Sequence, residues 1–222
     1  MKEPVLFAWS GGKDSAMALS ILQRSKKYKI AALLTNVTSC YNRISMHGVR
    51  SSLLERQAES IGLPLEKVLL PKRHSIEEYE FKMRKALEKY QKLGVSKVFF
   101  GDIFLADVRK YREGKLAKVG MTAQFPLWKR NTKKLAEEFI NQGFKAVITC
   151  VDSTVLGKEL AGEEFDYRLL SKLPANADPC GENGEFHSFV YDGPIFKKPI
   201  KHKKGRIVLR EKRFYYCDFL AK

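Results

Sequence analysis

The sequence Ser10-Gly11-Gly12-Lys13-Asp14-Ser15 follows the apolar run 4–9 and precedes the helix-favouring run 16–22. A strand, a glycine turn and a helix N-terminus form an anion site, because the glycines let the backbone approach a ligand and the free amides and helix dipole favour negative charge. Lys13 adds a positive charge for phosphate. The Asp14 carboxylate suits a magnesium bridge or a substrate contact. The stretch therefore predicts a phosphate-binding loop between a buried strand and a helix.

This loop differs from the common P-loop. The P-loop pattern requires glycine where Phe7 stands and serine or threonine where Asp14 stands. Ser-Gly-Gly-Lys-Asp-Ser instead resembles the PP-loop of the N-type ATP pyrophosphatases. The resemblance implies cleavage of ATP between the α- and β-phosphates, which gives AMP and pyrophosphate. The alternative interpretation is a tight strand-to-helix turn with a capping serine.

Composition indicates a folded protein with a basic surface. The chain has 222 residues, of which 44% are hydrophobic, so one large α/β domain or one domain with a small appendage is expected. The apolar runs are far shorter than the roughly 20 residues that span a bilayer, and a strand begins almost at the first residue. We therefore expect no membrane segment and no signal peptide. The four cysteines contain no C-x-x-C pair, which favours a reduced, cytoplasmic location without a zinc or redox site.

The net charge of +16 is the unusual quantity, with 41 Lys and Arg against 25 Asp and Glu. A field of that sign attracts nucleic acid and other polyanions. The segment 197–213 is especially rich in lysine and arginine. Contact with RNA is one interpretation, and a solvated lysine-rich surface is the other, because no RNA-binding motif is present.

Alternation of strand and helix patterns decides the fold class. Apolar strands are expected at 4–9, 29–36, 65–70, 97–100 and 145–151, and helices at 16–27, 50–61, 75–93 and 133–142, the last capped by Thr132. A turn of helix is expected at 106–111. This order predicts right-handed crossovers and a three-layer α/β sandwich with a parallel, HUP- or Rossmann-like sheet. Short strand patterns after residue 185 predict a small C-terminal α+β substrate region. We expect an ATP-binding domain at 1–152 and a substrate-binding region at 153–222.

Ligands of open α/β sheets bind beyond the carboxyl ends of the strands. The second strand ends at Leu34, Thr35 and Asn36, which are therefore expected beside the adenine and ribose. The fourth strand delivers Gly101 and Asp102 to the same edge. Together with the loop, the predicted nucleotide-binding residues are Ala8, Ser10, Gly11, Gly12, Lys13, Asp14, Ser15, Leu34, Thr35, Asn36 and Gly101.

Further segments extend the resemblance. Gly101-Asp102-Ile103, Phe125-Pro126-Leu127-Trp128 and the run 178–186, Asp-Pro-Cys-Gly-Glu-Asn-Gly-Glu-Phe, resemble the diphthine–ammonia ligase family of ATP pyrophosphatases. The resemblance reaches from the first strand to about Phe196. It implies that the enzyme adenylates a carboxylate, releases pyrophosphate, and lets ammonia displace AMP to form an amide. The family's archetypal substrate is diphthine on a translation elongation factor.

The sequence departs from that archetype in the second motif. The ligases tend to read Gly-Glu-Gly-Gly-Glu-Tyr-Glu-Thr, whereas residues 181–188 read Gly-Glu-Asn-Gly-Glu-Phe-His-Ser. Asn183 therefore replaces a glycine and His187 replaces an acid. These changes indicate a related branch whose acceptor the sequence does not name. Free ammonia is the expected nitrogen donor, because no glutaminase-like domain is visible.

The resemblance assigns roles to the site residues. Lys13 and Asp14 are the expected catalytic residues, with ATP and Mg²⁺ as cofactors and a protein- or RNA-borne carboxylate and ammonia as substrates. The expected substrate-binding residues are His47, Asp102, Glu182, Asn183 and Glu185. The alternative interpretations are an exposed acidic turn for Glu182 and Glu185, a loop cap for Asp102, and a satisfied polar group for His47. A homodimer is compatible with the sequence.

Two other functions remain open from the residues alone. A tRNA-modifying enzyme of the same ATP chemistry would fit the positive charge, but the absence of paired cysteines disfavours sulfur transfer. A protein that binds ATP or AMP without turnover is the non-enzymatic alternative. The presence of both Lys13 and Asp14 disfavours it.

Overall fold

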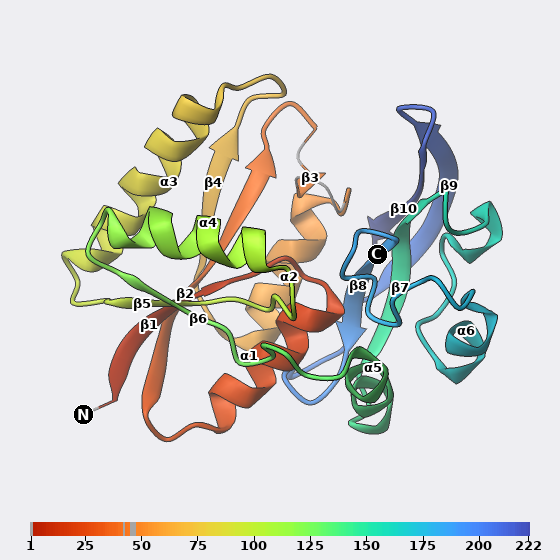
Figure 1. Ribbon diagram of the computed structural model, residues 1–222, viewed down its shortest axis with the longest axis horizontal. Helices are drawn as coiled ribbons and strands as arrows, with labels where there is room; N and C mark the ends of the chain where they lie inside the picture. The colour runs from red at the N-terminus through yellow and green to blue at the C-terminus, as the bar shows by residue number, and fades with distance from the viewer. Residues whose placement is uncertain (1, 42, 45–47) are drawn as a thin grey trace.

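The structure is a computed structural model that describes residues 2–41, 43–44 and 48–222. In these residues, six strands form the first sheet (Figure 1). Four of them lie in the order β2-β1-β5-β6, and β4 pairs with β2 on its other side. All these pairings are parallel, and only the two-residue strand β3 runs antiparallel to β2. The strands are β1 (Glu3–Ala8), β2 (Tyr28–Thr38), β3 (Arg43–Ile44), β4 (Leu65–Leu70), β5 (Lys97–Phe99) and β6 (Thr122–Gln124).

Helices cover both faces of this sheet. Leu6 and Leu34 belong to one buried cluster with Leu87 of α3 and Leu116 of α4. Their sequence neighbours Phe7 and Leu33 belong to the other cluster, which contains side chains of α1 and α2. Successive residues of a strand point to opposite faces, so the sheet forms the middle of three layers and the predicted sandwich is confirmed. The helices are α1 (Lys13–Arg24), α2 (Ser51–Ile61), α3 (Ile76–Gln91) and α4 (Ala106–Ala117).

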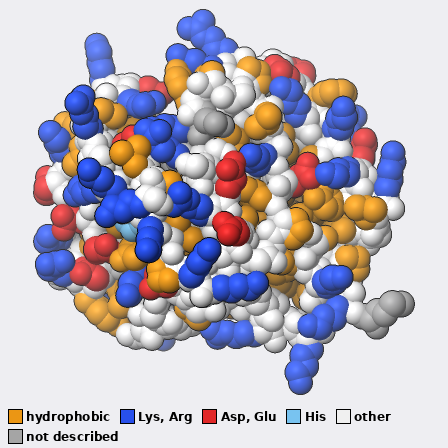
Figure 2. Space-filling model, turned by 180° about the vertical axis from the view of Figure 1, so that it is seen from behind, with side chains coloured by type: hydrophobic (Ala, Val, Ile, Leu, Met, Phe, Trp, Pro, Cys, Tyr) orange, Lys and Arg blue, Asp and Glu red, His pale blue; other side chains and the backbone are white. Residues whose placement is uncertain are grey.

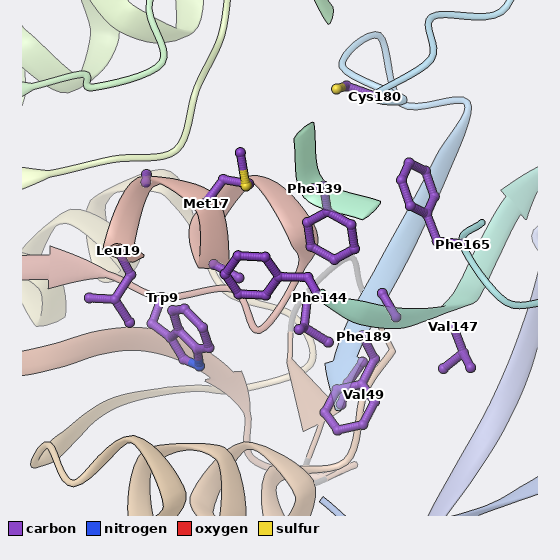
Figure 3. Close-up of a cluster of buried hydrophobic side chains, with 14 of the residues drawn as sticks. Trp9, Met17, Leu19, Val49, Phe139, Phe144, Val147, Phe165, Cys180 and Phe189 are labelled. Carbon is purple, nitrogen blue, oxygen red and sulfur yellow. The ribbon is translucent and has the colours of Figure 1, made fainter. Parts of the chain in front are cut away.

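A second, antiparallel sheet stands beside the first, with the order β8-β7-β10-β9. Its core is rich in aromatic side chains, and Phe139 stacks on Phe144 with ring centroids 5.0 Å apart. Figure 3 shows these rings in the same cluster as Trp9 and Leu19 of the first half, so one core joins the two sheets. The elements are α5 (Thr132–Asn141), β7 (Lys145–Asp152), the 3₁₀ helix η1 (Lys158–Leu160), α6 (Tyr167–Lys172), β8 (Phe186–Asp192), β9 (His202–Arg210) and β10 (Phe214–Ala221).

The structure departs from the sequence-based expectations in four places. The run 145–151 is strand β7, but it pairs with β8 and β10 and not with the parallel sheet, so the second sheet starts before residue 153. Strand β6 was not predicted, because its three residues carry no buried apolar side chain. Helix α4 is longer than the short turn expected at 106–111. Asn131, and not Thr132, caps α5. No helix among the described residues is long and apolar enough to cross a bilayer.

Candidate nucleotide and substrate site

The predicted phosphate loop, residues 10–15, is fixed from behind by two distant elements. Gly11 has a φ of 76°, a left-handed conformation that favours glycine. The Gly11 carbonyl accepts hydrogen bonds from Gln57 Nε2 of α2 at 3.0 Å and from the Val190 amide of β8 at 2.9 Å. A Cβ added at Gly11 would lie 2.6 Å from Gln57 Oε1. The glycine is therefore required for both the turn and the close approach of α2.

Hydroxyl groups order the front of the loop. Ser10 Oγ donates to Ser15 Oγ at 3.1 Å, and Ser15 Oγ donates to the Gly12 carbonyl at 2.8 Å. The Lys13 amide, in the first turn of α1, donates to Ser188 Oγ of β8 at 3.1 Å. The second sheet therefore touches the helix N-terminus directly, and the loop is preorganised before any ligand binds.

Lys13 carries the buried positive charge of the site. Its side chain is 4% exposed, and its ammonium contacts the Asp14 carboxylate at 2.8 Å. The ammonium also donates to the backbone carbonyl of Cys180. Burial opposes the charged form, but the neighbouring Asp14 carboxylate outweighs it and raises the pKa of Lys13 above its ordinary value. Lys13 therefore stays protonated at neutral pH.

A cavity of about 480 Å³ opens at the carboxyl ends of the parallel strands. Gly101 lets the end of β5 approach the first turn of α1, because a Cβ there would lie 2.9 Å from the Asp14 carbonyl carbon and the Ser15 nitrogen. The second sheet and the turn before it form the facing wall. The cavity brings together most of the predicted site residues, namely Ala8, Ser10, Gly12, Lys13, Asp14, Ser15, Leu34, Thr35, Asn36, Gly101, Asp102 and Glu182.

Glu182 on the facing wall and Asp102 at the end of β5 are also tied to the scaffold. Glu182 Oε1 accepts from the amides of Ile103 at 2.7 Å and Phe104 at 3.3 Å. Burial raises the pKa of Glu182, although these backbone hydrogen bonds favour its charged form. Asp102 accepts from Arg112 of α4 at 3.0 Å. Glu182 thereby holds the turn 178–185 against the end of β5, and the Lys13 ammonium contacts the same turn at the Cys180 carbonyl.

Several predicted residues do not line this cavity. Gly11 lies behind the loop, where it contacts Gln57 and Val190. Glu185 is 4% exposed and accepts from the Asp178 amide at 2.9 Å and from Asn183 Nδ2 at 3.0 Å, so Asn183 and Glu185 shape their own turn. His47 lies outside the described residues.

The site also contains residues that sequence reasoning missed. Arg112, His187 and Ser188 line the cavity, and Gln57 fixes the loop from behind. Burial, and then the Lys13 charge, lowers the pKa of His187 to about 4, so the imidazole is neutral at pH 7. His187 and Ser188 were within reach of sequence reasoning, because they follow the Gly-Glu-x-Gly-Glu segment directly. Gln57 gave a weaker signal, as a polar residue on the apolar face of a predicted helix.

The sequence matches two family models of known proteins. The family model of the diphthamide synthase N-terminal domain matches residues 1–123, and that of the diphthamide synthase C-terminal domain matches residues 131–219. The chain belongs to the diphthamide synthase family. The two matches meet between β6 and α5, where the chain passes from one sheet to the other. We propose this interval, and not residue 152, as the boundary between the two units.

The relatives are diphthine–ammonia ligases. The chain is 32% identical to the Schizosaccharomyces pombe protein over 105 residues, which are 45% of this chain and 16% of that protein. It is 26% identical to the Homo sapiens protein over an alignment of 228 positions, which covers 90% of this chain and 83% of that protein. Among solved structures, a predicted subunit of tRNA methyltransferase from Methanocaldococcus jannaschii is 17% identical, with a TM-score of 0.46 over 89% of this chain and all of that one. The chain thus matches only a small part of the first relative.

Proposed function

We propose that the protein is an ATP-dependent amidoligase of the diphthine–ammonia ligase type. A carboxylate oxygen attacks the α-phosphorus of ATP, so that an acyl adenylate forms and pyrophosphate leaves. Ammonia then attacks the acyl carbon, AMP leaves with the carboxylate oxygen, and one proton is released. The observation that carries the proposal is the buried Lys13 at the N-terminus of α1, whose ammonium lies against the acidic turn of the second unit at the wall of one cavity.

A smaller cavity suggests where the base binds. It has a volume of about 190 Å³, lies beneath α3 and α4, and shares Ala8, Leu34 and Asn36 with the main cavity. Its walls are mostly apolar, which suits a planar base. Thr35 Oγ1 and Asn36 Oδ1 are buried and have no hydrogen-bond partner among the described residues. We assign these two atoms to the ribose and the adenine, because buried polar atoms are normally paired.

The loop would serve the leaving group. Negative charge grows on the departing pyrophosphate, and Lys13 and the amides at the start of α1 are placed to neutralise it. No group of three or more metal-ligating side chains is present in the described chain. We therefore propose that Mg²⁺ is held mainly by the phosphate oxygens, with Asp14 as the protein carboxylate nearest to them. When bound, the ion would supply further charge neutralisation.

The facing wall would receive the acceptor and the nitrogen donor. No nucleophilic side chain is needed, because the substrate carboxylate and ammonia are the two nucleophiles. Glu182 and Asp102 place negative charge where ammonium would enter, whereas His187 presents a neutral ring to the same space. All four cysteines are free thiols, so we propose that the protein acts in the reduced cytoplasm.

The test is amide formation from labelled ammonia. The protein is incubated with ATP, Mg²⁺, ¹⁵N-ammonium and a purified translation elongation factor that carries diphthine. Mass spectrometry of the modified peptide should show the ¹⁵N-amide, with AMP formed in equal amount. AMP formation without the amide would overturn the ligase proposal, and binding of ATP with no turnover would favour the non-catalytic alternative.

A further inference from the structure

A third cavity lies away from the reaction site, between the end of β2 and the hairpin of β9 and β10. Its volume is about 750 Å³, larger than that of the nucleotide cavity. Ile44 lines both cavities, so the two spaces are neighbours. No residue of the predicted phosphate loop or of the acidic turn lines this cavity.

The walls carry an excess of positive charge. Five basic side chains, Arg43, Arg50, Lys72, Arg206 and Arg210, face two acidic ones, Glu211 and Asp218. The Asp218 carboxylate is shared between Arg43 at 2.8 Å and Arg50 at 2.6 Å, so one carboxylate serves two guanidinium groups. Arg206 has no ion pair or hydrogen bond with any residue that the structure describes. The cavity wall therefore keeps a net positive charge, as expected for a surface that binds an anion.

Tyrosine rings alternate with these charges. The Arg210 guanidinium carbon lies 6.0 Å from the centre of the Tyr41 ring and 5.7 Å from that of Tyr216. Lys72 Nζ lies 5.2 Å from the centre of the Tyr41 ring. Tyr41 is 44% exposed, so part of its ring is open to a ligand. A ring beside cations can stack on a nucleobase, which a simple basic patch cannot do.

The charges are spread along a line. One face of β9 lines the cavity with the exposed side chains of Arg206, Val208 and Arg210. At about 3.3 Å per strand residue, the arginines at either end stand roughly 13 Å apart. At this backbone spacing the two side chains can contact different phosphates of one chain. Figure 2 shows Lys and Arg side chains gathered over the half of the molecule that contains the second sheet.

We propose that this cavity, lined by Arg206, Arg210, Lys72 and Tyr41, binds single-stranded nucleic acid, with phosphates on the basic side chains and a base against Tyr41. An acidic protein segment could satisfy the charges, but it would leave the exposed ring without a stacking partner. The proposal goes beyond amidation, because it requires neither ATP nor the acceptor.

Fluorescence anisotropy tests the proposal on the full chain without ATP. The probes are labelled 12-residue oligouridylate and oligothymidylate, with a labelled polyglutamate peptide as the acidic comparison. The double variant Arg206→Ala/Arg210→Ala should bind the oligonucleotides at least tenfold more weakly. Its plot of log affinity against log salt should be about 1.4 shallower in slope, since each phosphate contact on a single strand contributes about 0.7. Lys85→Ala on α3 is the matched control and should bind as the unmodified chain does.

Tyr41 provides the second readout. Tyr41→Ala should weaken binding roughly tenfold, because stacking of one base contributes about 1–3 kcal/mol, whereas Tyr41→Phe should bind nearly normally. Thermal unfolding of each variant confirms that the fold is intact, and unchanged AMP formation separates this site from the reaction. Unchanged oligonucleotide binding by the double variant would overturn the proposal. So would equal affinity for polyglutamate with no effect of Tyr41→Ala, which would assign the surface to an acidic protein.

Discussion

Gln57→Leu tests the idea that the phosphate loop is held from behind by α2. Gln57 is fully buried and makes three hydrogen bonds. Its Oε1 accepts from Trp9 Nε1 at 3.1 Å, and its Nε2 donates to the carbonyls of Gly11 at 3.0 Å and Val190 at 2.6 Å. Leucine has a similar volume but no polar atoms, so the substitution removes these bonds without leaving a large cavity.

The expected loss of stability follows from these partners. The buried indole N–H of Trp9 would lose the acceptor that Gln57 provides, at a cost of about 1–3 kcal/mol. The Gly11 carbonyl keeps its bond from the Val190 amide, so its loss is smaller. The two bonds donated by Gln57 Nε2, less the gain from burying the apolar leucine, add about 1 kcal/mol. We therefore expect a net destabilisation of roughly 2–4 kcal/mol.

Thermal unfolding followed by circular dichroism measures this effect. For a chain of this size, about 2–4 °C is lost per kcal/mol, so the midpoint should fall by roughly 5–15 °C. The ATP concentration for half-maximal AMP formation should also rise, because Gly11 loses part of its anchorage. Gln142→Leu is the matched control, since the Gln142 side chain accepts its hydrogen bond from Arg24 at the surface, and its effect should stay within about 0.5 kcal/mol. A Gln57→Leu protein as stable as the unmodified chain would refute the reasoning.

Three further predictions concern the site and its support. Lys13→Met should reduce AMP formation at least ~10²-fold, as loss of one preorganised charge-stabilising group does in other enzymes, and a single-turnover assay would show it. Ser188→Ala removes the acceptor of the Lys13 amide and should lower kcat/KM about tenfold or less in steady-state kinetics; a loss as large as that of Lys13→Met would contradict its supporting role. The hydrogen bond from Arg213 lowers the pKa of Asp152 to about 2, below the unfolded value of about 3.9. Its stabilisation is therefore present above pH ~4 and lost as pH falls towards 2, so urea midpoints of Asp152→Asn should vary less with pH in that range.

The conformation of the loop at residues 10–15 was predictable because its determinants are local. Six consecutive residues supply the turn, the helix start, the charge and the hydroxyl groups, and the strand order places them beside Leu34 and Gly101. The contacts of Gln57 with Gly11 and Val190 join residues far apart in sequence, so no local pattern announces them. A polar residue on an apolar helix face was the available hint.

The acidic turn and β7 show two other features that the sequence alone could not predict. Glu182 and Glu185 belong to the same motif, but only the fold shows that Glu182 lines the cavity and that Glu185 is turned into its own loop. The apolar run 145–151 predicts a buried strand equally well in either sheet. Its partners, β8 and β10, come later in the chain and carry weak strand patterns, so the pairing could not be read in advance.

The most direct measurement follows the fate of the α-phosphate. ATP labelled with ³²P at that position is incubated with the protein, ammonium and diphthine-bearing elongation factor, and the nucleotides are separated by chromatography. If the loop at residues 10–15 presents the α-phosphorus to the carboxylate, the label should appear in AMP, with pyrophosphate as the other product. The Lys13→Met variant should form at least ~10²-fold less labelled AMP. Label recovered in ADP, with orthophosphate formed, would contradict the account.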